Sequence, residues 1–435
     1  MHRQLQLACF LGSLASLARA ECDVSDFMQC RRNLIAQIFN ASALPTKAAP
    51  DFTFNESESH PMRGWPAPGG GAAAAGSAAG DTIAWRNGRQ RLVWTLAGVA
   101  TNLTLNATVF HTFNTSGDAP ANYPPPPAAP GCPSAAASPD YASYARRGGT
   151  LVLYHNGHET ATCTPNYDGV VDHLNQLGYD VMELMMPLLG CNDAPQYGSP
   201  KKHAWFRQWE ERGEATMRFF VEPVVLAVNY AVALGYEHIV LLGLSGGGWT
   251  TTLAAAVDAR IELSIPTAGS VPKFSTSYLP AWTPDLPEGR GEGEGGGGDY
   301  EQLYEGRRKD MYDACDFACM YVLAALEPHR HQLQLLHEKD SCCFAAQGLH
   351  GPIRAYNDFV QRQLAAQGAG GGGWMQTAVT AGNYHQVNYR DKVLVATVVE
   401  RLRLQGGLSK ADFSQLPFDL LQIQSTGTGE FARAK

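Results

Sequence analysis

The spacing of hydrophobic residues divides this 435-residue chain into two regions with different patterns. In residues 21–147, apolar positions alternate with polar ones in two segments, 91–96 and 103–110. Alternation with a period of two predicts strands that bury one face. Beyond about residue 148, short apolar runs such as 150–154 are nearly continuous and alternate with helix-like stretches. This second pattern predicts an α/β fold, a mostly parallel sheet with helices on both faces.

The second region contains enough predicted elements for one large sheet. Further strands are expected at 180–186, 238–243, 261–265, 332–336 and 375–379. Helices are expected at 167–177, 204–234 and 249–257, with a break in the long one at Pro223, because proline cannot donate a helix hydrogen bond. We therefore divide the chain into residues 1–20, a β-rich N-terminal region at 21–147, and an α/β domain at 148–435.

The first twenty residues resemble a secretory signal peptide. A short basic start precedes an apolar run and the motif Ala18-Arg19-Ala20, which fits cleavage after Ala20. Five N-x-S/T sequons follow, all before residue 120, at Asn40, Asn55, Asn102, Asn106 and Asn114. Together these features predict a secreted or cell-surface glycoprotein.

Composition narrows the function classes. The chain is 45% hydrophobic and 17% charged, which is enough to bury a core. Its formal charge of −8 argues against a nucleic-acid binder, which needs a basic surface. No later apolar stretch reaches the roughly 18 residues of a spanning helix, so no transmembrane segment is expected.

Cysteine usage agrees with an oxidising compartment. Nine of the ten cysteines lie beyond residue 20, and we expect local disulfides Cys22–Cys30 and Cys163–Cys191. An alternative is a zinc site, formed by Cys315, Cys319, Cys342 and Cys343. A secreted chain favours disulfides over thiolate ligands, so this alternative is the weaker one. We also expect one or both of the adjacent cysteines 342 and 343 to be disulfide-bonded and to lock their loop.

One motif indicates nucleophilic chemistry. Gly243-Leu244-Ser245-Gly246-Gly247 follows a predicted buried strand and opens a predicted helix. A serine on such a turn presents its hydroxyl at the carboxyl edge of the sheet. The alternatives are a glycine-rich turn with an incidental serine, or a phosphate-binding loop, which here lacks the G-K-S/T sequence.

A serine nucleophile needs a base, and the base needs an acid that orients it. His385 follows the strand predicted at 375–379 and is the expected base; His331, His337 and His350 compete with it. Asp340 follows the strand predicted at 332–336 and is the expected acid. Glu338 is the alternative acid, and Asp316 is a distant third.

The developing oxyanion needs preorganised hydrogen-bond donors. We expect the backbone N–H of Gly246 and a donor from the loop after 150–154, at Asn156 or Gly157. The spacing His155-x-x-His158 in this loop allows a metal interpretation, but no third ligand is evident nearby. No metal or other cofactor is therefore expected.

These motifs resemble the α/β-hydrolase superfamily over residues 148 to about 400. The elbow at Ser245, the His-Asn-Gly loop at 155–157, Asp340 and His385 carry the resemblance, in the family's order Ser…Asp…His. The loop departs from the H-G-G-G sequence of many lipases. The resemblance implies a serine hydrolase that works through an acyl-enzyme, on a small-molecule or glycan-linked ester.

Other functions remain open at this point. A serine peptidase could use the same triad, and a binding protein could use the scaffold without catalysis. The N-terminal region does not match the hydrolase core. It predicts either an accessory domain or additional strands of the same sheet.

Overall fold

The computed structural model describes most of the chain. The described residues are 27–56, 89–113, 149–158, 163, 165–166, 168–192, 194, 203–276, 299–303, 306–367, 373–383 and 385–405. The predicted signal peptide and the sequon at Asn114 lie outside them, and only the backbone of Asn55 is described. Asn40, Asn102 and Asn106 are exposed.

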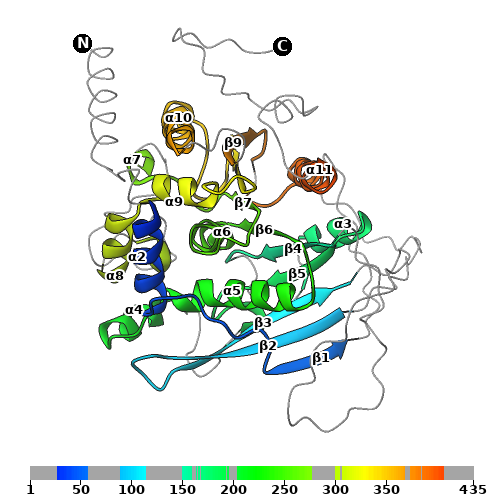
Figure 1. Ribbon diagram of the computed structural model, residues 1–435, viewed down its shortest axis with the longest axis vertical. Helices are drawn as coiled ribbons and strands as arrows, with labels where there is room; N and C mark the ends of the chain where they lie inside the picture. The colour runs from blue at the N-terminus through cyan, green and yellow to red at the C-terminus, as the bar shows by residue number, and fades with distance from the viewer. Residues whose placement is uncertain are drawn as a thin grey trace, which may run out of the picture.

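The described strands form one nine-stranded sheet (Figure 1). They are β1 (Phe52–Glu56), β2 (Arg89–Ala97), β3 (Thr104–Thr112), β4 (Thr150–His155), β5 (Asp180–Leu184), β6 (His238–Leu244), β7 (Leu263–Thr267), β8 (His331–His337) and β9 (Trp374–Thr380). Their order is β1-β2-β3-β5-β4-β6-β7-β8-β9. The last six strands in this order, β5, β4, β6, β7, β8 and β9, run parallel, so their carboxyl ends meet at one edge of the sheet.

The N-terminal strands continue this sheet. β3 pairs antiparallel with β5, with Val109 opposite Leu184, and β2 and β1 extend the same edge. The described strands of the N-terminal region are therefore additional strands of the same sheet and do not form a separate accessory domain. The region also contains α2 (Phe27–Phe39), a helix that the alternating pattern did not predict.

Helix α2 is fixed to the rest of the fold. Its buried Arg31 donates to the carbonyl of Ala256 at 3.0 Å and pairs with Glu327 at 2.6 Å. Cys30 forms a disulfide with Cys315, at the end of α8. The predicted pair Cys22–Cys30 is therefore wrong, because the partner of Cys30 lies 285 residues away in the sequence. The other predicted pair, Cys163–Cys191, is confirmed.

Helices cover both faces of the sheet (Figure 1). They are α3 (Val170–Gln176), α4 (Ala204–Glu211), α5 (Arg218–Ala233), α6 (Gly246–Val257), α7 (Lys273–Thr276), α8 (Gly306–Ala314), α9 (Phe317–Ala324), α10 (His350–Ala366) and α11 (Tyr389–Gln405). Alternate residues of β6 enter different cores. Val240 and Leu242 pack with α3 and α11, whereas Ile239 and Leu241 pack in the larger core with α5 and α6. The near-continuous apolar runs follow from this burial on both faces.

The long helical region at 204–234 breaks at a different residue from the predicted one. The chain leaves α4 at Arg212 and turns through Gly213, whose φ is 92°, before α5 begins at Arg218. Pro223 lies inside α5, so the predicted break there is wrong. Glycine accommodates the positive φ without a Cβ clash, whereas the proline removes only one hydrogen bond from a buried helix.

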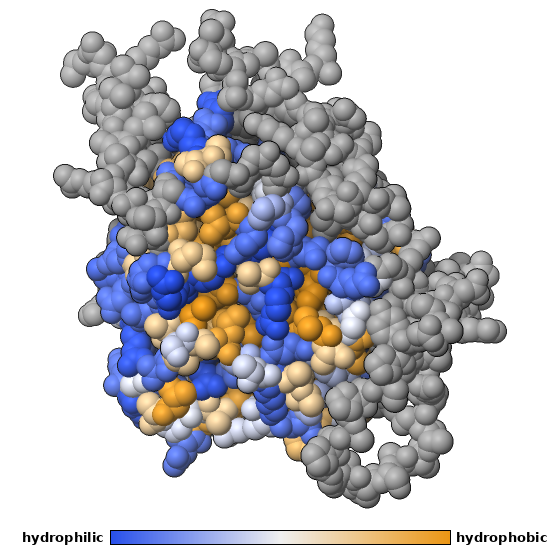
Figure 2. Space-filling model, viewed as in Figure 1, coloured by the Kyte–Doolittle hydropathy of each residue, from blue (hydrophilic) through white to orange (hydrophobic). Residues whose placement is uncertain are grey.

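The surface in the view of Figure 1 mixes residue types. Figure 2 shows hydrophilic and hydrophobic residues interspersed over the described part of this face. Among the described residues, no helix combines the length and the apolar composition that crossing a bilayer requires.

Candidate active site

Ser245 occupies a strained turn between β6 and α6. Its φ and ψ are 57° and −124°, which a residue with a Cβ rarely adopts. Its N–H donates to the carbonyl of Thr267 at 2.9 Å, and its carbonyl accepts from the N–H of Trp249 at 2.9 Å. Neighbouring backbone therefore holds the turn on both sides, as the motif predicts.

The glycines beside Ser245 permit close backbone contacts. A Cβ on Gly243 would lie 2.2 Å from the carbonyl oxygen of Gly247. A Cβ on Gly247 would lie 2.1 Å from the carbonyl oxygen of His155 and 2.6 Å from that of Asn156. The first turn of α6 therefore packs directly against the loop after β4, which is where the oxyanion donors were predicted.

Asp340 and His385 come together after β8 and β9. Nδ1 of His385 lies 2.8 Å from Oδ2 of Asp340 and 3.0 Å from Oδ1. The backbone N–H of His385 donates to Oγ of Ser341 at 3.2 Å. Because the carboxylate only accepts, Nδ1 carries the proton and Nε2 is the basic atom of the neutral ring. This is the tautomer that a serine hydrolase requires.

Several donors converge on the carboxylate of Asp340. The N–H groups of Cys342 and Cys343 donate to its Oδ1 at 2.7 and 3.1 Å. Burial disfavours the charge of Asp340, but His337, His385 and these N–H groups outweigh burial and lower its pKa. The carboxylate therefore stays ionised beside His385.

Behind Asp340 lies a buried ion pair that the sequence did not reveal. Nε2 of His337 lies 2.8 Å from Oδ2 of Asp391, and Nδ1 lies 3.7 Å from Oδ2 of Asp340. Oδ1 of Asp391 accepts from Thr380 Oγ1 at 2.9 Å. Burial lowers the pKa of His337, but the two carboxylates outweigh it and raise this pKa to about 9. A positive charge on His337 therefore lies near Oδ2 of Asp340, the oxygen that His385 also contacts.

The competing residues lie in other settings. His331 begins β8, at the opposite edge of the sheet, and stacks on Trp374. His350 pairs with Glu338, the alternative acid, at 3.2 Å. Asp316 accepts from the N–H of Cys319 at 3.0 Å and so caps α9. The structure thus brings Asp340 to His385 and gives Glu338 a different partner.

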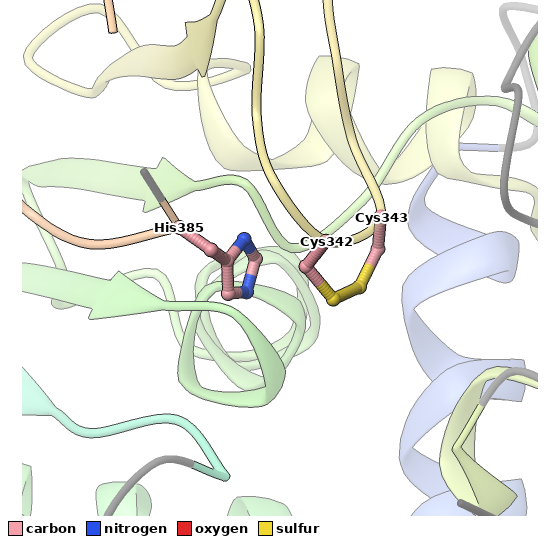
Figure 3. Close-up of side chains that lie close together, drawn as sticks. All are labelled: Cys342, Cys343 and His385. Carbon is pink, nitrogen blue, oxygen red and sulfur yellow. A yellow bond between two sulfur atoms is a disulfide. The ribbon is translucent and has the colours of Figure 1, made fainter. Parts of the chain in front are cut away.

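Cys342 and Cys343 are bonded to each other, as Figure 3 shows beside His385. A ring nitrogen of His385 and the two sulfur atoms lie within 4.8 Å of one another. The expectation that these cysteines are oxidised is confirmed. The zinc alternative is wrong, because Cys315, Cys319, Cys342 and Cys343 are all disulfide-bonded and offer no thiolate.

The loop after β4 is held inward by Asn156. Its side-chain amide donates to Oε1 of Glu183 at 2.7 Å and to the carbonyl of Leu184 at 3.3 Å, and its backbone N–H donates to the same carbonyl at 2.9 Å. Burial raises the pKa of Glu183 to about 7, against the hydrogen bonds from Asn156 and Asn166. Both donors of Asn156 are therefore engaged within the fold, and the second oxyanion donor stays a prediction for this loop, at Asn156 or Gly157.

The side chains of the two histidines in the His155-x-x-His158 pattern contact different partners. His155 is fully buried, its Nδ1 lies 2.8 Å from the carbonyl of Asn156, and burial lowers its pKa to about 4. His158 instead meets His203 and Glu301, which come from distant parts of the sequence. These two residues could not be recognised as partners of His158 from the sequence, because they lie far from it along the chain.

All the predicted catalytic residues lie beyond the carboxyl ends of parallel strands. Ser245 follows β6, Asp340 follows β8, and His385 follows β9. The predicted oxyanion loop follows β4, the strand next to β6. In open α/β sheets this edge is where ligands bind.

Comparison with known proteins supports the same architecture. No family model matches the sequence, and no curated protein matches it. Among solved structures, Methylesterase BT1017 aligns at 13% identity over 90% of this chain and 67% of its own, with a TM-score of 0.51. The fold is that of the α/β-hydrolases.

Two further solved structures align with lower TM-scores. An acetyl xylan esterase from Paenibacillus sp. R4 aligns at 11% identity, with a TM-score of 0.45, over 86% of this chain and 94% of its own. Est1E from Butyrivibrio proteoclasticus, solved with ferulic acid bound, aligns at 16% identity, with a TM-score of 0.37, over 59% and 88%.

Proposed function

We propose that the protein is a secreted serine hydrolase that cleaves a carboxylic ester through an acyl-enzyme. Ser245 is the nucleophile, His385 the base and Asp340 the orienting acid. The observation that carries the proposal is the contact of Asp340 with Nδ1 of His385, at the sheet edge that bears the strained Ser245 turn. This arrangement leaves Nε2 of His385 as the proton acceptor.

The reaction has two halves with matching proton transfers. Oγ of Ser245 attacks the ester carbonyl and passes its proton to Nε2 of His385. The N–H group of Gly246 and a second donor from the loop after β4, at Asn156 or Gly157, stabilise the oxyanion. Collapse breaks the ester C–O bond, and His385 returns the proton to the leaving alcohol. Water then attacks the acyl-Ser245 by the same route and releases the acid.

Asp340 supports both halves through charge. Its carboxylate stabilises the imidazolium that forms on His385, and its lowered pKa keeps it ionised. The His337–Asp391 pair holds a second imidazole against the same carboxylate. The carboxylate of Asp340 is therefore positioned by two imidazoles, those of His385 and His337.

An ester is the substrate class that we favour. One solved structure that aligns with a TM-score of 0.51 is named a methylesterase. The described N-terminal strands extend the sheet instead of forming a separate domain that would restrict peptide access. Secretion and glycosylation agree with the disulfides Cys30–Cys315 and Cys163–Cys191 and with the exposed Asn40, Asn102 and Asn106.

A substrate panel tests the proposal. Wild-type protein and the Ser245→Ala variant would be assayed against p-nitrophenyl esters of increasing acyl length and against aminoacyl p-nitroanilides. We expect hydrolysis of the esters by wild type alone. Amide cleavage that exceeds ester cleavage would identify a peptidase, and no hydrolysis by folded wild type would favour a binding protein.

A further inference from the structure

A second cluster of ionisable side chains lies beside the proposed active site. Nε2 of His158 lies 3.2 Å from Nδ1 of His203 and 3.0 Å from Oε1 of Glu301. Nδ1 of His203 lies 3.2 Å from Oε2 of Glu301. His203 and Glu301 are buried, with 7% and 0% of the side chain exposed, and His158 is 22% exposed. One ligand atom from each of these residues therefore lies within 4.8 Å of the other two.

The outer ring nitrogens lie near oxygen atoms of the protein. Nε2 of His203 lies 2.9 Å from the carbonyl of Pro187, which only accepts, so this nitrogen carries a proton and Nδ1 faces the cluster. Nδ1 of His158 lies 3.4 Å from Oδ2 of Asp299, within ion-pair distance. Metal-binding histidines are characteristically held in this way, with the second nitrogen bonded to a carbonyl or a carboxylate.

The distances between the facing atoms suit a small divalent cation. Ligands about 2.0–2.1 Å from a tetrahedral zinc ion are roughly 3.3 Å apart. The two facing imidazole nitrogens are 3.2 Å apart, and each lies 3.0 to 3.2 Å from one of the two oxygens of the Glu301 carboxylate, which is close to this value. The carboxylates of Glu301 and Asp299 supply negative charge that attracts a divalent cation into this place. Nitrogen and oxygen ligands without sulfur suit zinc among the metals available outside cells.

We propose that His158, His203 and Glu301 bind a zinc ion, with Asp299 as the carboxylate that orients His158. The three ligands come from the loop after β4, the residue that precedes α4, and the 3₁₀ turn η6 (Tyr300–Gln302). Three protein ligands leave a fourth position for water or another oxygen ligand. This assignment replaces the sequence expectation that no metal is bound.

The site adjoins the serine turn but is independent of the proposed ester chemistry. A Cβ on Gly246 would lie 2.5 Å from Cε1 of His158 and 2.7 Å from Cε of Met186, so the His158 ring packs against the residue after Ser245. Zinc binding would therefore fix the 299–303 segment and the His158 ring against the proposed oxyanion donor. The metal can be present or absent whether or not Ser245 acts on esters.

Metal content tests the proposal directly. The full chain would be secreted from a eukaryotic host in zinc-supplemented medium, dialysed against metal-free buffer, and measured by inductively coupled plasma mass spectrometry. We expect about one zinc ion per wild-type chain and little in His203→Ala and Glu301→Gln. Asp299→Asn would retain zinc with an affinity about 10- to 100-fold lower.

A matched control separates zinc binding from a general effect of removing a histidine. His238 forms an ion pair with Glu262 at 2.8 Å, at the start of β6, the opposite end of the strand from Ser245. His238→Ala should keep the full zinc content. Equal zinc in wild type and Glu301→Gln, or none in folded wild type, would overturn the proposal.

A thermal titration covers variants that fold poorly. Wild-type protein stripped with chelator should melt at a higher temperature when zinc is added, because a ligand that binds only the folded state stabilises it. Glu301→Gln, which preserves the shape of the side chain, should show no such rise. A wild-type melting temperature that does not respond to saturating zinc would contradict the site.

Discussion

The two sides of the proposed active site are built by different means. On the nucleophile side, backbone packing around Ser245 sets the geometry, and the contacts of Gly243 and Gly247 leave no room for a side chain. On the acid–base side, side chains do this work: Asp340 meets His385 and His337, and Asp391 holds His337. The backbone around Ser245 leaves no space for an added side-chain atom, whereas the Asp340–His385 side depends on charge and hydrogen bonds. Substitutions on the two sides should therefore fail in different ways.

The largest expected effect separates activity from folding on the acid–base side. Asp340→Asn can keep the N–H bonds of Cys342 and Cys343 but loses the charge beside His385. We expect kcat/KM for an activated ester to fall about 10⁴-fold, because the imidazolium is no longer stabilised and the tautomer is wrong. Thermal melting and ester kinetics would be measured together. Glu338→Gln is the control, and a larger loss in that variant would show that the acid is misassigned.

The backbone side should instead lose stability. In Gly247→Ala the new Cβ would meet the carbonyl oxygens of His155 and Asn156 at 2.1 and 2.6 Å. We expect a loss of about 3 kcal/mol or more in the free energy of unfolding, measured with urea. Gly351→Ala in α10 is the matched control, since no atom lies within 4 Å of that Cβ. It should be neutral or stabilising by up to about 1 kcal/mol. Similar stability losses in both variants would contradict the packing argument.

A pH scan isolates the charge behind Asp340. The pKa of His337 rises in the folded protein from 6.5 to about 9, so the folded state binds the proton more tightly. Its stabilisation is complete below pH 6.5 and is lost as the pH rises through about 9, with a limit of roughly 3 kcal/mol. We expect the wild-type melting temperature to fall between pH 7 and 9.5 and His337→Gln to fall less. Parallel curves would argue against a protonated His337.

The disulfide between Cys342 and Cys343 should have the smallest effect. Its loop is too short to restrict the unfolded chain much, so stability should change little. Because these residues donate two N–H groups to Asp340, Cys342→Ser with Cys343→Ser should lower kcat/KM about fivefold, or about 1 kcal/mol. Ester kinetics with and without reductant would check this. Unchanged activity in the double variant would remove the proposed role in positioning Asp340.

The same contrast explains what could be predicted from the sequence. The role of Ser245 could be predicted from the sequence because the strand, the turn glycines and the helix are adjacent in the chain. Asp340 and His385 could be predicted from their order after strands. Asp391 could not be predicted, because its partner His337 lies 54 residues earlier and no local sequence pattern indicates that the two residues interact.

Elements missed elsewhere have similar causes. The sequence predicts a helix break at Pro223, whereas the chain turns at Gly213. Burial of α5 against the rest of the fold compensates for the hydrogen bond that Pro223 cannot donate. The partner of Cys30 was missed because it lies 285 residues away. The cluster of His158, His203 and Glu301 forms only when three separate segments meet. Long-range contacts, not local patterns, made these features invisible in the sequence.

The reactivity of Ser245 is the most direct test of the whole account. Folded full-length protein would be treated with a fluorophosphonate probe, digested and mapped by mass spectrometry, beside Ser245→Ala and His385→Ala. We expect a single adduct on Ser245 in wild type, none in Ser245→Ala and much slower labelling in His385→Ala. Labelling at another residue, or a folded wild-type protein that does not react, would contradict it.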